Sequence, residues 1–201
     1  MPAEVRASIS KLYLAGPEVF LRDATELGDA KKALCAKYGF EGVFPLDNQV
    51  DLKARPPRET GLHIGGLNEA LIRTCDAIVA NMTPFRGPSA DVGTALEMGI
   101  AAGLGLVVCG YSNTAQTFFA RTVAFLGQRT TSDADTTVRD GEGQSIEDFE
   151  LHDNLMLESC IAVTRGVFFA HDATVGDALR ATEGFEQCLR WLRDRVPSPG
   201  G

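Results

Sequence analysis

Glu97 is a carboxylate in an apolar stretch whose spacing is that of a helix. Its helical neighbours, three and four residues away, include no cation; they are Gly93, Thr94, Ile100 and Ala101. A carboxylate without such a partner is costly to bury unless its chemistry requires it there. Gly93 lies one turn before Glu97 on the same face, so no side chain blocks the approach to the carboxylate. Glu97 is therefore a candidate reactive group.

Asp91 supplies a second carboxylate at the start of the same helix, and Thr94 adds a hydroxyl beside the gap left by Gly93. The helix follows a loop rich in proline and glycine, which itself follows a buried strand expected at 77–80. A second interpretation stays open, in which Asp91 only caps the helix and Glu97 faces solvent. The loop, the open helix face and the paired acids together favour a functional site.

The composition is typical of a globular protein that does not bind nucleic acid. Of the 201 residues, 44% are hydrophobic and 23% are charged. This length predicts one domain, residues 1–201, with a flexible leader at 1–10 and a flexible tail at 197–201. A net charge of -8 argues against a nucleic-acid partner, because phosphate binding favours a basic surface. Small nucleosides remain open as ligands.

Cysteine and histidine spacing predicts no metal site. The five cysteines, at 35, 75, 109, 160 and 188, include no C-x-x-C pair, which is typical of reduced thiols. His63, His152 and His171 share no metal-ligand spacing, so we expect no metal or organic cofactor. No signal peptide is visible, and the longest apolar run, at about 100–109, is too short to cross a bilayer. We therefore expect a cytoplasmic protein with no membrane partner.

Strand-like and helix-like segments alternate along the chain. Strands are predicted at 11–15, 43–46, 77–80, 104–109 and 166–170. Helices are predicted at 24–38, 63–74, from 89 or 91, at 114–126, from 154 and at 175–196, with an irregular loop at 49–61 and a polar, mobile stretch at 127–145. This alternation predicts an α/β protein with a doubly wound parallel sheet of about five strands and helices on both faces.

The loops that follow the first three strands are expected to form the ligand site. In a doubly wound sheet, ligands bind beyond the carboxyl ends of the strands, where the strand order reverses. This rule brings together the loops at 16–20, 47–49 and 83–91. No G-x-G-x-x-G follows a strand and no Walker glycine–lysine pair exists, so a dinucleotide or triphosphate site is not expected.

Five motifs in these segments together resemble, in the same order, those of the nucleoside 2-deoxyribosyltransferase family. They are Tyr13–Phe20 (YLAGPxVF), Pro45–Gln49 (PLDNQ), Asn81–Gly87 (NxTPFRG), Asp91–Gly99 (DVGTAxExG) and Asn154–Leu157 (NLML). The resemblance implies a flavodoxin-like (Rossmann-like) fold. It also implies transfer of 2-deoxyribose between the nucleobases of 2'-deoxynucleosides, without a cofactor.

The resemblance also assigns roles to particular residues. The family's nucleophilic glutamate corresponds to Glu97, its carboxylate for the sugar 5'-hydroxyl to Asp91 and its strand-one tyrosine to Tyr13. An asparagine-x-methionine pair, which in the family enters the site from a neighbouring subunit, corresponds to Asn154 and Met156. The resemblance therefore implies a homo-oligomer. The single-chain alternative is that Asn154 caps a helix.

The implied chemistry agrees with the residues themselves. Retaining glycosyl transfer uses a carboxylate that attacks the anomeric carbon, and a second acceptor then opens the glycosyl-enzyme. Glu97 is placed for that attack, and a Tyr13 hydroxyl would hydrogen-bond and orient it. The alternative for Tyr13 is an ordinary strand tyrosine.

Four further residues after the first two strands are candidates for contact with the substrate. Gly16 and Phe20 follow the first strand, where Phe20 is expected to form an apolar wall for the base, with a core role as the alternative. Asp47 and Gln49 are candidates for hydrogen bonds to the base edge, although turn chemistry after a strand also favours such residues.

Asp91 favours free 2'-deoxynucleosides and nucleobases as substrates. A carboxylate accepts a hydrogen bond from a 5'-hydroxyl but repels a phosphate dianion. Arg22 and Arg86 are the nearest cations that would weaken this objection. The alternatives are an N-glycosidase, acting on 2'-deoxynucleosides or their 5'-monophosphates, and a non-catalytic nucleoside-binding domain.

Two features depart from the family pattern. Lactobacillus-type enzymes carry an aspartate near the base where this chain has Asn68, and an amide cannot protonate a departing base. Either activation of the leaving base comes from elsewhere, with Asp47 as the candidate, or Asn68 only orients the base. Those enzymes also end in an aromatic residue whose terminal carboxylate reaches the site, which the ending PSPGG cannot copy. The stretch at 127–145 is either a lid or an insertion.

Overall fold

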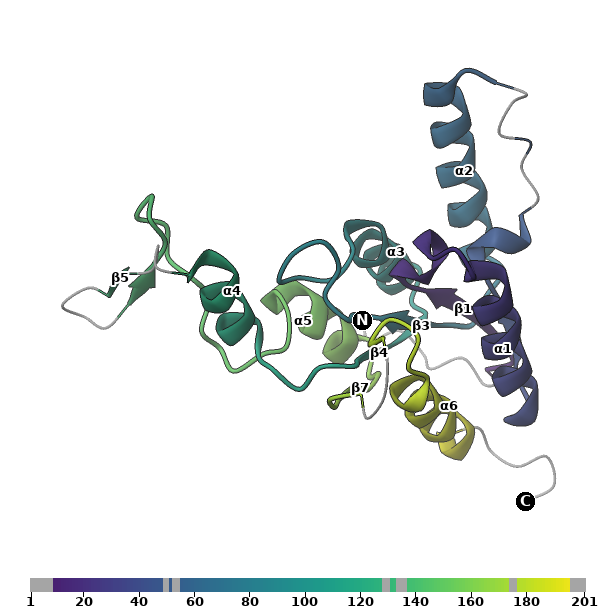
Figure 1. Cartoon of the computed structure of the whole chain (residues 1–201). Helices are drawn as coiled ribbons and strands as arrows, with labels where there is room; N and C mark the ends of the chain where they lie inside the picture. Colours follow the sequence, from purple (N-terminus) through teal and green to yellow (C-terminus); the bar gives the residue numbers. More distant parts are fainter. Residues whose placement is uncertain are drawn as a thin grey trace.

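Five parallel strands form one sheet at the centre of the molecule (Figure 1). The computed structural model describes residues 9–48, 51, 55–127, 131–132, 137–173 and 177–195. The sheet order is β2-β1-β3-β4-β7, with β1 at Lys11–Ala15, β2 at Glu41–Val43, β3 at Ala77–Asn81, β4 at Val107–Ser112 and β7 at Phe168–Ala170. This order is that of flavodoxin-like proteins and confirms the predicted fold class. Of the predicted flexible ends, 1–8 and 197–201 lie outside the described residues.

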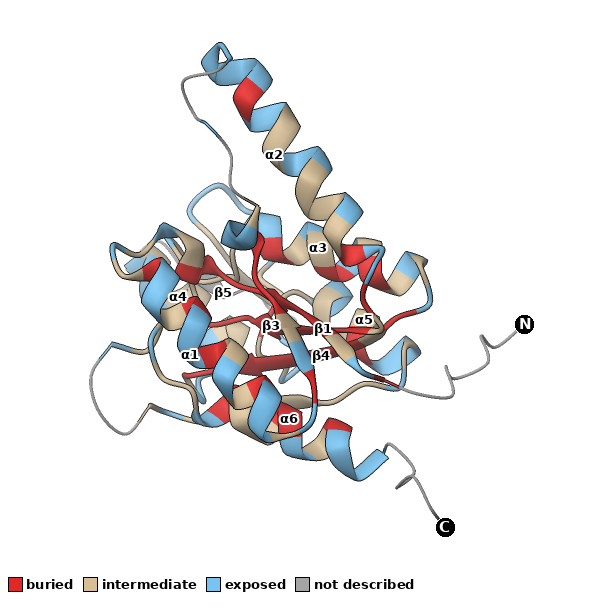
Figure 2. Cartoon of the chain, turned by 90° about the vertical axis from the view of Figure 1, so that its right-hand side faces the viewer, coloured by how far each residue is buried: buried red, intermediate tan, exposed pale blue. Residues whose placement is uncertain are grey.

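Helices cover both faces of this sheet because its strands are apolar on both sides. Leu12 and Leu14 of β1 belong to one apolar cluster, with residues of α1 (Ala24–Lys37) and α6 (Glu183–Arg195). Tyr13 and Ala15 belong to the other cluster, with residues of α3 (Val92–Gly103), of α5 (Leu155–Val163) and of the end of α2 (Pro57–Ile72). Figure 2 shows the buried strands between these two layers.

Two segments extend away from the sheet in Figure 1. The far part of α2 projects at the upper right, and α4 (Phe118–Leu126) lies at the left with a short hairpin of β5 (Thr131–Ser132) and β6 (Val138–Arg139). The hairpin gives antiparallel structure to part of the stretch predicted to be mobile at 127–145. Within the described part of the chain, no helix is long and apolar enough to span a membrane.

Several element boundaries differ from the sequence prediction near the site. α2 begins at Pro57, so the end of the loop predicted at 49–61 is helical; proline suits the first turn of a helix because its missing N–H is not needed there. The second strand ends at Val43 and is followed by a short 3-10 helix, η2, at Pro45–Asp47. β4 begins at 107 rather than 104, because the backbone N–H of Leu104 still bonds into α3.

Three other elements are shorter than predicted. α4 begins after Thr117, whose hydroxyl caps the helix by accepting a hydrogen bond from the backbone of Ala120 at 3.2 Å. α6 spans 183–195 rather than 175–196, and the described residues 177–182 before it are not helical. The last strand begins at 168 rather than 166.

Glu18 belongs to the loop that follows β1, and its side chain is fully buried. It lies in a short 3-10 helix, η1 (Pro17–Phe20), and forms an ion pair with the buried Lys31 of α1. Its Oε1 atom also accepts hydrogen bonds from Asn81 Nδ2 at 2.9 Å and from Tyr111 Oη at 3.2 Å. These bonds tie η1 to α1, β3 and β4, and so fix the loop that carries Gly16 and Phe20.

Glu18→Gln is expected to lower the free energy of unfolding by about 3–5 kcal/mol, because it leaves the Lys31 ammonium buried without its counter-charge. Chemical denaturation followed by circular dichroism measures this change. Glu69→Gln is the matched control, since its ion pair with Arg73 is exposed on α2 and contributes about 0.5 kcal/mol. Equally small changes in both variants would contradict a supporting role for Glu18.

Candidate active site

A cavity of about 280 Å³ opens where the strand order reverses, beside the loop that follows β1 and the start of α3. Its lining comes from that loop, from η2, from α2 and from α3: Gly16, Val19, Phe20, Pro45, Leu46, Ile64, Asn68, Asp91, Gly93, Thr94 and Glu97. Six candidates named from the sequence are among them: Gly16, Phe20, Asn68, Asp91, Gly93 and Glu97.

Glu97 is held at this cavity by Tyr13. The phenolic hydroxyl of Tyr13 donates a hydrogen bond of 2.6 Å to Glu97 Oε1, which joins a fully buried residue of β1 to α3. Burial raises the pKa of Glu97 to about 7; the Tyr13 hydrogen bond opposes this rise and the nearby Asp91 carboxylate adds to it. Burial also raises the pKa of Tyr13 well above its ordinary value, so the phenol stays protonated as a donor. Near neutral pH, Glu97 can therefore act as a nucleophile or exchange a proton.

Asp91 both caps α3 and lines the cavity. Its Oδ2 atom accepts hydrogen bonds from the backbone N–H of Thr94 at 3.0 Å and from the Thr94 hydroxyl at 3.3 Å. Capping therefore does not exclude a place in the site, and it fixes the carboxylate at the helix start. A Cβ at Gly93 would lie 2.9 Å from Asp91 Oδ2, so glycine leaves this carboxylate its room.

Asn68 reaches the cavity from α2 with an unsatisfied group. Its side-chain oxygen is buried and has no hydrogen-bond partner within the described residues. Buried acceptors are usually satisfied, so this atom suits a ligand that brings a donor. Ile64, one helical turn earlier, lines the same cavity and was missed from the sequence, although its spacing of four residues from Asn68 would have placed it there.

Phe20 forms part of an aromatic stack at the cavity rather than part of the core. Its side chain is 54% exposed, and its ring lies parallel to that of Phe85, with centroids 5.2 Å apart. The guanidinium group of Arg86 lies 5.0 Å from the Phe20 ring centroid and 4.6 Å from that of Phe85. Phe20 itself lines the cavity, while Phe85 and Arg86 pack against its ring and are not part of the lining.

Asp47 does not line the cavity. One of its oxygens accepts a hydrogen bond from the Phe44 backbone N–H at 2.9 Å, and the other pairs with Lys32 Nζ at 2.6 Å. These contacts stabilise η2 and tie it to α1, which is the turn role named as the alternative for Asp47. Gln49, the other candidate for the base edge, lies outside the described residues.

Asn154 and Met156 do not line the cavity of their own chain. Asn154 caps α5 by accepting a hydrogen bond from the Met156 backbone N–H at 3.1 Å, and its amide donates to Glu147 Oε1 at 2.7 Å. The Met156 side chain is exposed. The helix-cap alternative for Asn154 is thus present in the structure, and it leaves the Met156 side chain available to another molecule.

The described lining of the cavity carries two carboxylates and no cation. Neither Arg22 nor Arg86 is part of that lining. Among the residues that the structure describes, no group of three or more His, Cys, Asp or Glu side chains is arranged to hold a metal ion. The two carboxylates of the lining are those of Asp91 and Glu97.

Known proteins match this chain in sequence and in structure. The family model for nucleoside 2-deoxyribosyltransferases matches residues 12–156. An uncharacterized protein of Schizosaccharomyces pombe is 31% identical over 179 residues, covering 84% of each chain. A 2-deoxyribosyltransferase from Leishmania mexicana has 29% identity and a TM-score of 0.62, covering 92% of this chain and 98% of that one.

A conserved protein from Enterococcus faecalis shares the fold, with a TM-score of 0.50 and 18% identity over 92% of this chain and 99% of its own. The family match spans the motifs from Tyr13 to Met156 and confirms the resemblance found in the sequence. The chain belongs to the nucleoside 2-deoxyribosyltransferase family.

Proposed function

We propose that the protein transfers the 2-deoxyribosyl group between the nucleobases of 2'-deoxynucleosides, with Glu97 as the nucleophile. Family membership supports an activity of this type. The observation that carries the proposal is the position of the Glu97 carboxylate, which lines the cavity while Tyr13 binds its Oε1 atom. The second oxygen, Oε2, is then the atom that attacks the anomeric carbon.

The reaction proceeds in two displacements at C1' of the sugar. In the first, Glu97 Oε2 bonds to C1', the glycosidic bond breaks, and its electron pair leaves with the base, which takes a proton from solvent. In the second, a nitrogen of the incoming base bonds to C1', the ester to Glu97 breaks, and the incoming base loses its proton. Two inversions retain the configuration at C1'.

Asp91 and Asn68 would recognise the two ends of the nucleoside. The Asp91 carboxylate accepts a hydrogen bond from the 5'-hydroxyl, and the unsatisfied Asn68 oxygen accepts one from an N–H of the base. The described lining offers no cation to a 5'-phosphate and places two carboxylates nearby, which favours free nucleosides over nucleotides. Position 68 carries an amide where lactobacillus-type enzymes carry an aspartate, so we assign no proton donor for the leaving base to that position.

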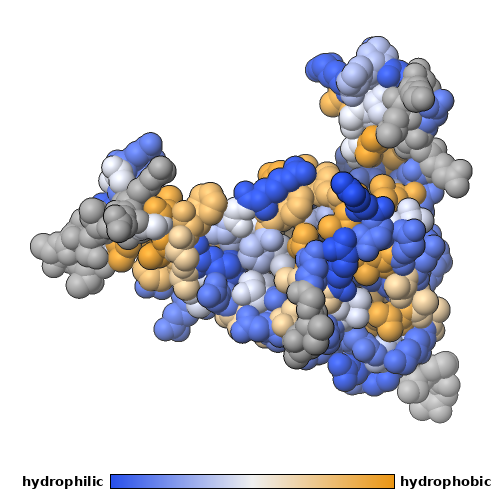
Figure 3. All heavy atoms as spheres, in the orientation of Figure 1, coloured by the Kyte–Doolittle hydropathy of each residue, from blue (hydrophilic) through white to orange (hydrophobic). Residues whose placement is uncertain are grey.

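A neighbouring subunit would complete the site through Asn154 and Met156. The helices α3 and α5 pack against each other, and both carry exposed apolar side chains that support this proposal. These side chains are Val92, Leu96, Leu155, Met156 and Val163. Figure 3 shows apolar atoms at the molecular surface over α3 and on the side that carries α4. Such surfaces in a small protein mark sites of association.

Purified protein is expected to convert 2'-deoxyinosine and adenine into 2'-deoxyadenosine and hypoxanthine, separated by chromatography, with thymidine as a second donor. Glu97→Gln should lower the rate by about three orders of magnitude or more, because an amide is a poor nucleophile. Glu41→Gln is the matched control and should keep the wild-type rate, since Glu41 is exposed at the amino end of β2.

Each other outcome has a definite meaning. Release of free hypoxanthine without 2'-deoxyadenosine would replace the transferase by an N-glycosidase. An unchanged rate in Glu97→Gln would contradict the role of Glu97. Ligand binding without turnover of any nucleoside or nucleotide donor would indicate a nucleoside-binding domain.

Tyr13→Phe is expected to raise the pKa of Glu97 by about one unit or more, because it removes a hydrogen bond that stabilises the carboxylate. The nucleophile must be ionised, so kcat/KM should fall as the pH drops through about 7 in the wild type, and at a higher pH in the variant. Carbon-13 NMR titration of the glutamate side chains measures the pKa directly. Tyr38→Phe, which removes a hydroxyl bonded to Glu186, should leave the pKa of Glu97 unchanged. A Glu97 pKa in Tyr13→Phe equal to that of the wild type would contradict the prediction.

A further inference from the structure

We propose that Asp153, paired with Arg121, is a positioning residue that sets the geometry of the 5'-hydroxyl subsite through Asp91. The inference rests on the proposed function, because it assigns Asp91 to the sugar. Neither Asp153 nor Arg121 lines the cavity. Their effect on the substrate must therefore pass through the backbone that they hold.

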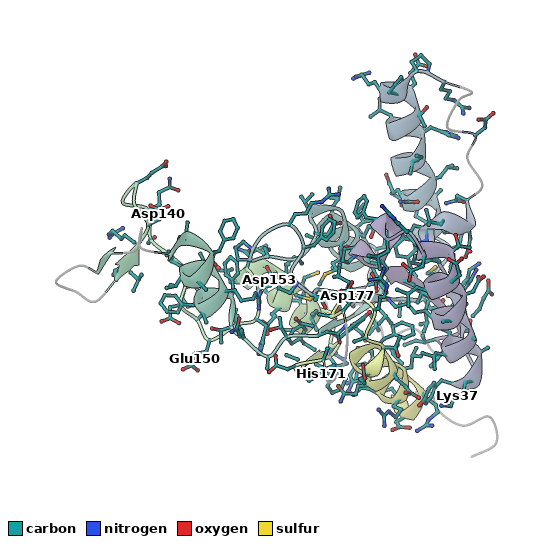
Figure 4. The ribbon with its side chains drawn as sticks, in the orientation of Figure 1. Lys37, Asp140, Glu150, Asp153, His171 and Asp177 are labelled. Carbon is teal, nitrogen blue, oxygen red and sulfur yellow. The ribbon has the colours of Figure 1, made fainter. Side chains whose placement is uncertain are left out.

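Asp153 binds the loop that ends at Asp91. It is almost fully buried, and its Oδ2 atom accepts a hydrogen bond of 2.8 Å from the backbone N–H of Ala90, the residue directly before Asp91. Its Oδ1 atom accepts a hydrogen bond from the Ser89 hydroxyl and another, at 2.8 Å, from the backbone N–H of Asn154. One carboxylate thus connects the start of α3 to the start of α5, and Figure 4 shows Asp153 beside α5.

Arg121 holds the same two segments from α4. Its Nε atom donates to the carbonyl of Pro88 at 2.8 Å, and its Nη2 atom donates to the carbonyl of His152 and lies 3.5 Å from Asp153 Oδ2. Its Nη1 atom donates to the carbonyl of Gln116. The guanidinium group is buried, so these bonds are not weakened by competing water.

This pair supplies geometry more than stability. A buried ion pair often contributes no more to stability than apolar side chains of the same size would, because both charges lose their hydration. Its directional bonds nevertheless fix Pro88, Ser89 and Ala90 in one conformation. Asp91 follows them directly, so this contact holds the loop through which the chain enters α3 at Asp91.

Asp153→Asn tests the inference, because the amide offers one acceptor where the carboxylate offers two and turns an N–H toward a donor. The variants are made in Glu97→Gln protein, whose slow turnover leaves the ligand intact during the measurement, and calorimetry measures the Kd of 2'-deoxyinosine and of 2',5'-dideoxyinosine. We expect Asp153→Asn to weaken 2'-deoxyinosine binding by about tenfold and 2',5'-dideoxyinosine binding by less than about twofold. The second ligand lacks the hydroxyl that Asp91 would bind.

Equal weakening of both ligands, or of neither, would overturn the inference. Asp172→Asn is the matched control, because its carboxylate binds the backbone N–H of Ala115 in another loop, and it should leave both affinities unchanged. Ser89→Ala, which removes a single bond to Asp153, provides a milder variant if Asp153→Asn does not fold, and should change the two affinities in the same unequal way. The turnover of the wild-type protein tests the proposed function separately.

Discussion

The hydrogen bond from Tyr13 to Glu97 is the interaction on which the site depends. It joins a fully buried residue of β1 to α3, the helix that follows β3, and the strand order reverses between these two strands. Burial of a carboxylate is costly, and here it raises the pKa of Glu97 to about 7 even though Tyr13 donates to the group. The fold thus holds a carboxylate that is more basic than usual, with one of its oxygens bonded to Tyr13.

Two buried ion pairs support this arrangement from either side of the sheet. Glu18 and Lys31 hold the loop after β1, which carries Gly16 and Phe20 at the cavity. Asp153 and Arg121 hold the loop that ends at Asp91. In both cases the charged groups bind backbone or side chains of several elements, so the walls of the cavity keep one geometry while the apolar clusters supply most of the stability.

Much of the fold and the site is predictable from the sequence, because the relevant residues lie in short local patterns. Apolar runs predict the strands, and helical spacing places Gly93 beside Glu97. Asp47 shows where such patterns stop being sufficient. Its partner Lys32 lies fifteen residues earlier on another element, and no local pattern shows that their side chains meet. The observed helix ends differ from the predicted ones for a related reason. A single side-chain hydrogen bond, such as the one that Thr117 accepts, sets where a helix begins.

The most direct test of the central claim is detection of the deoxyribosyl group on Glu97. Wild-type protein is mixed with 2'-deoxyinosine without an acceptor base, quenched rapidly in acid, digested and analysed by mass spectrometry. The account predicts that the peptide containing Glu97 gains the mass of one deoxyribosyl group, and that the gain disappears when adenine is added before the quench. Active protein that carries the group on another residue, or on none, would contradict Glu97 as the nucleophile.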